Sequence, residues 1–234
     1  MTEPFSILIV GYGRMGRLVE ALAPEYGARV AGRVDSRGAA RPEEWPAADV
    51  AIDFSTAEAV RENLPRLAHR GMNLVIGTTG WAEHEGALRH ALSSVGVVAA
   101  ANFALGVNLF FAIAKQAGEL LAPLPQFGAW IHEAHHAAKK DAPSGTALAI
   151  QEAVVAGGYS ARIDMASTRA GFIPGTHTLG FDSAAETITL THTARDRSTF
   201  ARGALEAARW VRGKRGWFTM TEVLGLDVAR PGRS

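Results

Sequence analysis

A glycine-rich turn near the N-terminus constrains the fold more than any other feature of the sequence. The turn reads Gly11-Tyr12-Gly13-Arg14-Met15-Gly16, and it stands between the apolar run 6–10 and a helical pattern over 15–22. In that setting the Gly-x-Gly-x-x-Gly spacing allows a tight turn, the close approach of a pyrophosphate, and packing of the helix against the strand. The sequence therefore predicts a doubly wound α/β domain that binds a dinucleotide. An S-adenosylmethionine site, or a glycine turn without a ligand, is the alternative.

An acidic residue stands where such a domain binds the adenosine ribose. Asp35 follows the predicted strand 29–34, and a carboxylate there accepts hydrogen bonds from ribose hydroxyls. That carboxylate would repel a 2′-phosphate and so favours NADH. In contrast, Arg14, Arg33 and Arg37 offer cationic partners for the 2′-phosphate of NADPH. The sequence leaves the choice between the two cofactors open.

Strand and helix patterns alternate through the first hundred residues, as in a parallel sheet covered by helices. Strands are predicted at 6–10, 29–34, 50–54, 73–76 and 95–101, and helices at 15–22, 56–70 and 82–92. Apolar runs without alternation indicate strands buried on both faces. Ligands bind beyond the carboxyl ends of such strands, so we expect two further turns to face the cofactor: Gly77-Thr78-Thr79-Gly80 and Ala100-Ala101-Asn102-Phe103. Each turn also fits ordinary turn and capping chemistry.

The pattern changes after Asn102. A helix at 105–121, a strand at 127–133, a helix at 144–155 and short strands at 161–170, 175–182 and 186–193 predict a second, α+β domain with a mostly antiparallel sheet. Helices at 199–212 and 221–226 are expected to complete the first domain. We therefore expect one domain over residues 1–103 and 200–234, and a second over residues 104–199.

The polar cluster that follows the strand at 127–133 begins with a string known from zinc enzymes. Residues 132–136 read His-Glu-Ala-His-His, which contains the His-Glu-x-x-His pattern. That pattern binds zinc on a helix, where its two histidines share a face. Here it ends a strand-like run and precedes Lys139 and Lys140, whose charges oppose a dication. We expect no metal.

The rest of the cluster, from Lys139 to Thr146, has the composition of an anion site. Pro143-Ser144-Gly145-Thr146 opens a helix, which offers backbone N–H groups, hydroxyls and a dipole that favours negative charge. A serine-capped helix with solvated lysines is the alternative. The convergence of His135, His136 and Lys139 on this segment favours a binding site.

The segment from Glu133 to Thr146 resembles the Glu-x-His-His-x-x-Lys-x-Asp-x-Pro-Ser-Gly-Thr signature of the 4-hydroxy-tetrahydrodipicolinate (dihydrodipicolinate) reductase family. The resemblance extends over most of the chain, from the Gly-Arg-Met-Gly of the first turn to Gly216-Trp-Phe-Thr-Met. It implies an NAD(P)H-dependent oxidoreductase of diaminopimelate and lysine biosynthesis. It further implies a cytoplasmic homotetramer whose first domain binds the dinucleotide and whose second binds substrate and forms the oligomer.

The resemblance also implies roles for individual residues. His135 corresponds to a proton donor and acceptor, and Lys139 to a proton donor that contacts the substrate. Together with the anion site, it predicts that the substrate is bound by His136, Lys139, Ser144, Gly145, Thr146 and Arg197. The cofactor contacts are predicted to be Gly11, Tyr12, Gly13, Arg14, Met15, Gly16, Asp35, Gly77, Thr78, Thr79, Ala100, Ala101, Asn102 and Phe103.

The amino-acid composition excludes several other classes of protein. The chain has 24 Lys and Arg against 23 Asp and Glu, so it lacks the basic surplus that binds nucleic acid. It has no cysteine, which excludes disulfides and cysteinyl thioester mechanisms. The uncharged run 91–114 is interrupted by Asn and Gly, and the N-terminus lacks the basic region of a signal peptide, so we expect no membrane contact and a cytoplasmic location. A different NAD(P)-dependent reductase and a nucleotide-sensing regulator remain as rival interpretations.

Overall fold

The computed structural model describes residues 4–35, 38 and 41–226, which form two compact units. The first contains the described residues up to Leu105 and from Ser198 onward, and the second runs from Gly106 to Arg197. Arg37, one of the arginines weighed for cofactor preference, lies outside the described residues.

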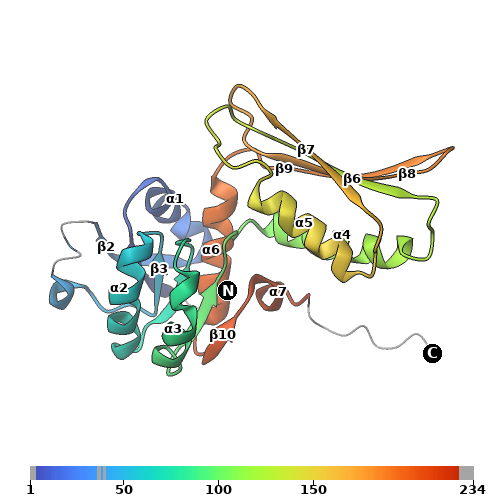
Figure 1. Ribbon diagram of the computed structural model, residues 1–234. Helices are drawn as coiled ribbons and strands as arrows, with labels where there is room; N and C mark the ends of the chain where they lie inside the picture. The colour runs from blue at the N-terminus through green and yellow to red at the C-terminus, as the bar shows by residue number, and fades with distance from the viewer. Residues whose placement is uncertain (1–3, 36–37, 39–40, 227–234) are drawn as a thin grey trace. The chain divides into compact units, whose positions relative to one another are not determined.

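The first unit is a six-stranded sheet with helices on both faces (Figure 1). Its strands are all parallel, in the order β10-β5-β4-β3-β1-β2. The strand bounds are β1 Phe5–Val10, β2 Ala28–Val34, β3 Val50–Asp53, β4 Asn73–Ile76, β5 Gly96–Ala99 and β10 Gly216–Phe218. The helices are α1 Arg14–Leu22, α2 Ala57–His69, α3 Glu85–Ala91, α6 Ser198–Val211 and α7 Met220–Val223. The predicted Rossmann-type architecture is confirmed.

The apolar runs form strands that are buried on both faces, as their lack of alternation predicts. In β1, Ile7 and Ile9 belong to the core that includes residues of α1 and α6. Leu8 and Val10 point the other way, into the core that includes residues of α2 and α3. One strand therefore contributes to two cores, which fixes the sheet as the central layer of the unit.

Three elements of this unit differ from the sequence-based expectation. Strand β10 was not predicted, because it is only three residues long and becomes a strand by pairing with β5. The helix expected at 82–92 begins as a 3-10 turn over Ala82–His84, so α3 itself is shorter. The last helix starts earlier than expected, because Thr219 and Glu222 form a reciprocal capping box at its N-terminus.

The second unit is a four-stranded sheet with two helices on one face (Figure 1). The strand order is β7-β6-β8-β9, with β6 Gly128–His135, β7 Ile163–Arg169, β8 Thr176–Asp182 and β9 Thr187–Thr193. The helices are α4 Leu105–Leu121 and α5 Gly145–Ala156.

This second sheet is mixed. Strands β8 and β9 pair in the predicted antiparallel manner, and β6 pairs antiparallel with β8. The exception is β6 with β7, which is parallel. The chain between those two strands runs through α5, and a long crossover of this kind returns the next strand in the same direction. Within the described chain, none of the helices combines the length and apolar character needed to cross a membrane.

Candidate active site

The glycine turn lies at the carboxyl end of β1, between its neighbours β2 and β3. Gly11 has φ 88°, and a β-carbon there would lie 2.3 Å from the carbonyl oxygen of Phe54. A β-carbon on Gly16 would lie 2.5 Å from the carbonyl oxygen of Gly11. In contrast, Gly13 caps α1 and has open space where a side chain would stand. The first and third glycines are thus required by packing, while the second leaves the helix N-terminus accessible to a phosphate.

At the end of β2, the predicted ribose-binding acid is exposed. The Oδ1 atom of Asp35 accepts the N–H of Gly38 at 2.9 Å. Nearby, the guanidinium of Arg33 forms an ion pair with Glu20, which also accepts the hydroxyl of Tyr12. The positive charge of Arg33 is therefore balanced within the protein.

The turn after β4 is braced by a buried carboxylate. Thr78 donates its hydroxyl to Oδ1 of Asp53 at 2.6 Å, and Ser55 donates both its N–H and its O–H to the same oxygen. Burial raises the pKa of Asp53. A β-carbon on Gly77 would lie 2.1 Å from the Phe54 ring, so this glycine is required for packing. The predicted contact residues Gly77 and Thr78 thus also shape the turn.

The turn after β5 has the ordinary helix-capping chemistry that the sequence also allows for it. Asn102 accepts the N–H of Ala104 at 2.9 Å, just before α4. The side chain of Phe103 is buried and meets the Phe54 ring edge-on. A contact from Phe103 to a cofactor would therefore come from its backbone.

A pocket of about 320 Å³ opens at the carboxyl ends of β4 and β5. The predicted cofactor residues Thr78, Thr79, Ala100 and Ala101 line it. Gly80, which ends the predicted turn, also lines the pocket, whereas sequence reasoning missed the rest of the wall, which is Trp81, Ala82, Glu85, Arg89, Ala99, Trp217 and Thr219. The indoles of Trp81 and Trp217 lie 6.1 Å apart, and only the pairing of β10 with β5 brings them together.

In the second unit, strand β6 changes character along its length. Its buried side chains are apolar at Ala129 and Ile131 and titratable at Glu133 and His135. His132 lies on the opposite, exposed face, with Nε2 3.0 Å from the Thr168 hydroxyl. The His-Glu-x-x-His string therefore ends a strand, as predicted: residues 132–135 alternate between the two faces of β6, and His136 lies in the turn that follows.

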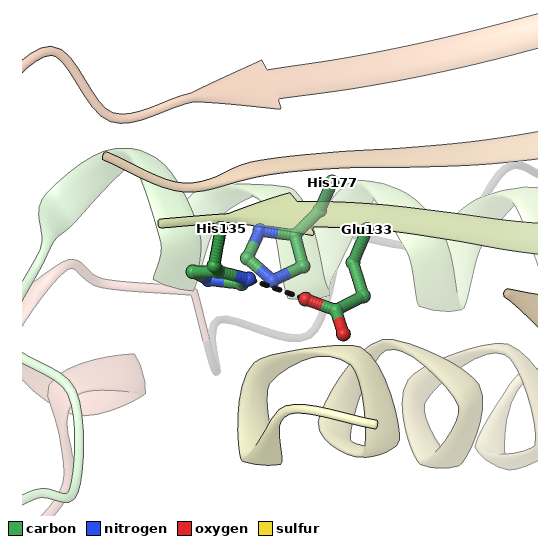
Figure 2. A group of neighbouring side chains, drawn as sticks. All are labelled: Glu133, His135 and His177. Carbon is green, nitrogen blue, oxygen red and sulfur yellow. Dashed lines mark hydrogen bonds and ion pairs between the residues drawn. The ribbon is translucent and has the colours of Figure 1, made fainter. Parts of the chain in front are cut away.

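Glu133 forms the centre of a buried network. One carboxylate oxygen contacts Nδ1 of His135 (Figure 2). The other accepts a hydrogen bond of 2.7 Å from Arg169. Burial raises the pKa of Glu133, but hydrogen bonds from Arg169 and Ser167 and the nearby positive charges outweigh it and lower the pKa to about 2. Burial lowers the pKa of His135, so its imidazole is neutral near pH 7.

A second histidine enters the same space from β8. The rings of His135 and His177 meet edge-on with centres 5.0 Å apart. His177 Nε2 lies 3.2 Å from the hydroxyl of Ser144, and burial lowers the pKa of His177 to about 4. Its Nδ1 atom is buried without a hydrogen-bond partner in the protein. Sequence reasoning counted Gly175-Thr-His177 in the family resemblance but assigned no role to His177, because His177 becomes a neighbour of His135 only through the β6–β8 register.

Ligand atoms of Glu133, His135 and His177 lie within 4.8 Å of one another, which is within the reach of a metal ion. However, both oxygens of Glu133 already have protein partners, and Arg169 supplies the positive charge that a metal would supply. The geometry is that of a hydrogen-bonded acid–base pair with an arginine counter-charge.

The predicted substrate residues fall into three environments. Lys139 forms an ion pair with Asp141 at 2.8 Å, in the turn after β6 that also holds the half-buried His136. Ser144 caps α5 and is 2% exposed, so its hydroxyl serves Ala147 and His177. Gly145, at the first turn of α5, is exposed with open space around it. Arg197 is exposed at the last residue of the unit.

Two family models match nearly the whole chain. Residues 5–103 match "Dihydrodipicolinate reductase, N-terminus", and residues 106–224 match "Dihydrodipicolinate reductase, C-terminus". A 4-hydroxy-tetrahydrodipicolinate reductase of Zymomonas mobilis is 37% identical and covers 97% of this chain and 100% of its own length. One from Acidiphilium cryptum is 41% identical and covers 92% of this chain and 94% of its own.

A solved structure has the same fold. It is the dipicolinate-bound dihydrodipicolinate reductase from Paenisporosarcina sp. TG-14, with a TM-score of 0.78 and 21% identity, covering 94% of this chain and 98% of its own. The matched region includes both units.

Proposed function

Because the chain belongs to the dihydrodipicolinate reductase family, we propose that it reduces 4-hydroxy-tetrahydrodipicolinate to tetrahydrodipicolinate, with His135 and Lys139 handling the proton. It is an NAD(P)H-dependent oxidoreductase of the diaminopimelate and lysine pathway. The observation that carries the residue assignment is the buried pair of Glu133 and His135, which stands next to the turn of Lys139 and the N-terminus of α5.

The N-terminus of α5 has the chemistry to hold a carboxylate of the substrate ring. Gly145 and Thr146 form the first turn of α5, at the positive end of the helix dipole, where the backbone of Gly145 also hydrogen-bonds Asp141. Lys139, which is paired with Asp141 at 2.8 Å, and His136 lie in the adjoining turn. Ser144 acts by capping the helix, because its hydroxyl is already engaged. Arg197 is a further candidate for the second carboxylate.

A bound nicotinamide would supply a hydride to the ring, and the reduction also consumes one proton and releases the 4-hydroxyl group as water. The ammonium of Lys139 can donate a proton, and Nε2 of a neutral His135 can accept one and pass it on, so these are the groups placed for the proton transfer. The glycine turn fits the pyrophosphate, because Gly13 leaves the N-terminus of α1 open. The pocket beyond β4 and β5 fits the nicotinamide end, where Thr78, Thr79, Ala100 and Ala101 meet.

The residues at the adenosine end of the cofactor site favour NADH over NADPH. Asp35 presents a carboxylate to the ribose, and Arg33 is neutralised by Glu20 instead of being available to a 2′-phosphate. We therefore expect a higher kcat/KM for NADH.

The second unit is the substrate-binding and oligomerisation domain in this proposal, and the first is the dinucleotide-binding domain. The face of the second sheet away from α4 and α5 is exposed and rich in threonine, including the cross-strand pair Thr178 and Thr191 at 3.1 Å. We infer a cytoplasmic homotetramer from membership of the family. Light scattering at working concentration tests it, and a monomer would contradict it.

A coupled assay tests the reaction. The ring substrate is generated in situ, and the absorbance loss of NADH and NADPH is followed separately, with simple 2-oxo acids as competing substrates. Oxidation that depends on the ring substrate is the expected result. Oxidation with 2-oxo acids alone would indicate a different reductase, and binding of both cofactors without turnover would leave only the dinucleotide domain assigned.

A further inference from the structure

Glu133 is the charged side chain most completely removed from solvent in the candidate site, with 0% exposure. Its neighbours on the same face of β6, Ala129 and Ile131, belong to the apolar core of the second unit. Burying an ionised carboxylate costs several kcal/mol, of the order expected for an ion moved out of water, unless it is paired and hydrogen-bonded. A glutamate at this position therefore does something that an apolar residue could not.

Both oxygens of Glu133 are engaged. Arg169 donates from Nη2 to Oε1 at 2.7 Å, and Oε2 contacts Nδ1 of His135. Arg169 stands directly beside His135 in the β6–β7 register, so the parallel pairing places the guanidinium against the pair. An ionised carboxylate can only accept a hydrogen bond, so the hydrogen between Glu133 and a neutral His135 must be on Nδ1.

We propose that Glu133, held by Arg169, is a positioning residue that fixes His135 in the tautomer with its hydrogen on Nδ1. Nε2 is then the nitrogen that carries the lone pair, and it faces the glycine at position 175, where the absence of a side chain leaves space. The low pKa of Glu133 keeps the carboxylate ionised across the working pH range. This inference rests on the proposed function, because the tautomer controls the rate only if His135 exchanges a proton with substrate.

Arg169 has a second link to the site. The same Nη2 atom donates to the backbone carbonyl of Asp141 at 2.5 Å, and the carboxylate of Asp141 holds Lys139 at 2.8 and 2.9 Å. One guanidinium therefore ties the strand that carries His135 to the turn that carries Lys139. Both groups proposed to handle the proton are oriented from a single side chain.

The decisive variant is Glu133→Gln. Because Arg169 can only donate, the glutamine would turn its carbonyl oxygen to Arg169 and its amide NH₂ to Nδ1 of His135, which must then lose its hydrogen. Nitrogen NMR of the ¹⁵N-histidine-labelled protein, without substrate, reads the tautomer directly. We expect Nδ1–H in the wild type and Nε2–H in Glu133→Gln. We also expect kcat to fall about 10²–10⁴-fold, the usual worth of a positioned acid–base group, with the KM for the cofactor unchanged.

Two further variants separate positioning from folding. Glu119→Gln, at an exposed glutamate of α4, is the matched control and should keep the tautomer and the rate. Glu133→Asp keeps the carboxylate and should retain the Nδ1–H form and more activity than Glu133→Gln, whereas a purely structural role would damage both variants alike. The wild-type spectrum alone overturns the proposal if it shows Nε2–H, so the test does not depend on any variant folding.

The outcomes distinguish this inference from the proposed function. A wild-type protein that does not oxidise cofactor with the ring substrate overturns the proposed function and, with it, the catalytic meaning of the tautomer. An active wild type whose Glu133→Gln variant keeps Nδ1–H, or loses less than about tenfold in kcat, overturns the inference alone.

Discussion

The imidazole of His135 faces Gly175, and a β-carbon added to that glycine would lie 3.1 Å from Nε2 and 3.2 Å from Cδ2 of the ring. The contact is closer than a relaxed side chain accepts, so the imidazole or the glycine turn would have to move. Gly175 also has φ 143°, a conformation that other residues adopt only with strain. The glycine before β8 thus leaves the space in front of the nitrogen that we assign to the substrate.

Gly175→Ala is expected to lower kcat by about tenfold or more, because a small displacement of a proton-transferring group has effects of that order. Steady-state kinetics with the ring substrate measure it. Gly158→Ala is the control, since Gly158 has φ 96° in the same unit but meets only a β-carbon at 3.9 Å. Equal losses in both variants would mean that backbone strain, and not crowding of His135, is responsible.

Replacing the two groups proposed to handle the proton should separate turnover from cofactor binding. His135→Ala and Lys139→Ala are each expected to reduce kcat about 10²–10⁴-fold while the dissociation constant for NADH stays the same. Steady-state kinetics measure kcat, and fluorescence titration with NADH measures the dissociation constant. His132→Gln, on the exposed face of the same strand, should behave like the wild type. Normal turnover in both alanine variants would contradict the site assignment.

Cofactor preference should respond to the partner of Arg33. In Glu20→Gln the ion pair is lost, and Arg33 becomes available to a 2′-phosphate. We expect the ratio of kcat/KM for NADPH to that for NADH to rise about tenfold, the worth of one charge-assisted hydrogen bond. Glu25→Gln, which removes the exposed partner of Arg202 in the same unit, serves as control. A wild type that prefers NADPH would refute the assignment of Asp35 and Glu20.

Buried histidines should make the protein sensitive to mild acid. Burial lowers the pKa of His177 to about 4, and His135, His192 and Lys139 nearby also disfavour its charged form, with only Glu133 acting in the opposite direction. The unfolded chain binds a proton to this histidine near its ordinary pKa of 6.5, whereas the folded protein does not until about pH 4. The stability contributed by neutral His177 is therefore complete above pH 6.5 and is lost as the pH falls toward 4.

Urea denaturation at pH 7 and pH 4.5 measures this effect. His177→Gln should reduce the pH-dependent part of the free energy of unfolding by about 2–3 kcal/mol. A pKa difference of one unit between the folded and unfolded states corresponds to about 1.4 kcal/mol for one proton. His132→Gln controls for the loss of a histidine on the exposed face of the same sheet. An identical pH dependence in wild type and His177→Gln would show that His177 takes up its proton equally in both states.

Much of the fold followed from the sequence because its signals are local. The strand at 73–76 and the helix at 105–121 have the predicted bounds, because each is a continuous apolar or amphipathic run that ends at residues unfavourable to that element. Strand β10 and the parallel pairing of β6 with β7 were not predicted. Both depend on which strand lies beside which, and that information is absent from any single segment.

The candidate site divides in the same way. The glycine turn, His135, Lys139 and the cap of α5 were recognised because their residues are adjacent in sequence and form motifs. Arg169 and His177 received no role, and the tryptophan wall of the first pocket was missed, because these residues reach their sites only through the pairing of separate strands.

The family, the two kinds of sheet and the residues of the acid–base and phosphate motifs can be inferred from residue spacing along the chain. Which atoms of those residues are available depends on how distant segments pack in the folded protein. That packing encloses Glu133 against Arg169, engages Ser144 with His177 and neutralises Arg33 with Glu20. The physical reason is that hydrogen-bond partners and burial are set by side chains from distant segments, and these fix the charge, the tautomer and the free lone pair of each group.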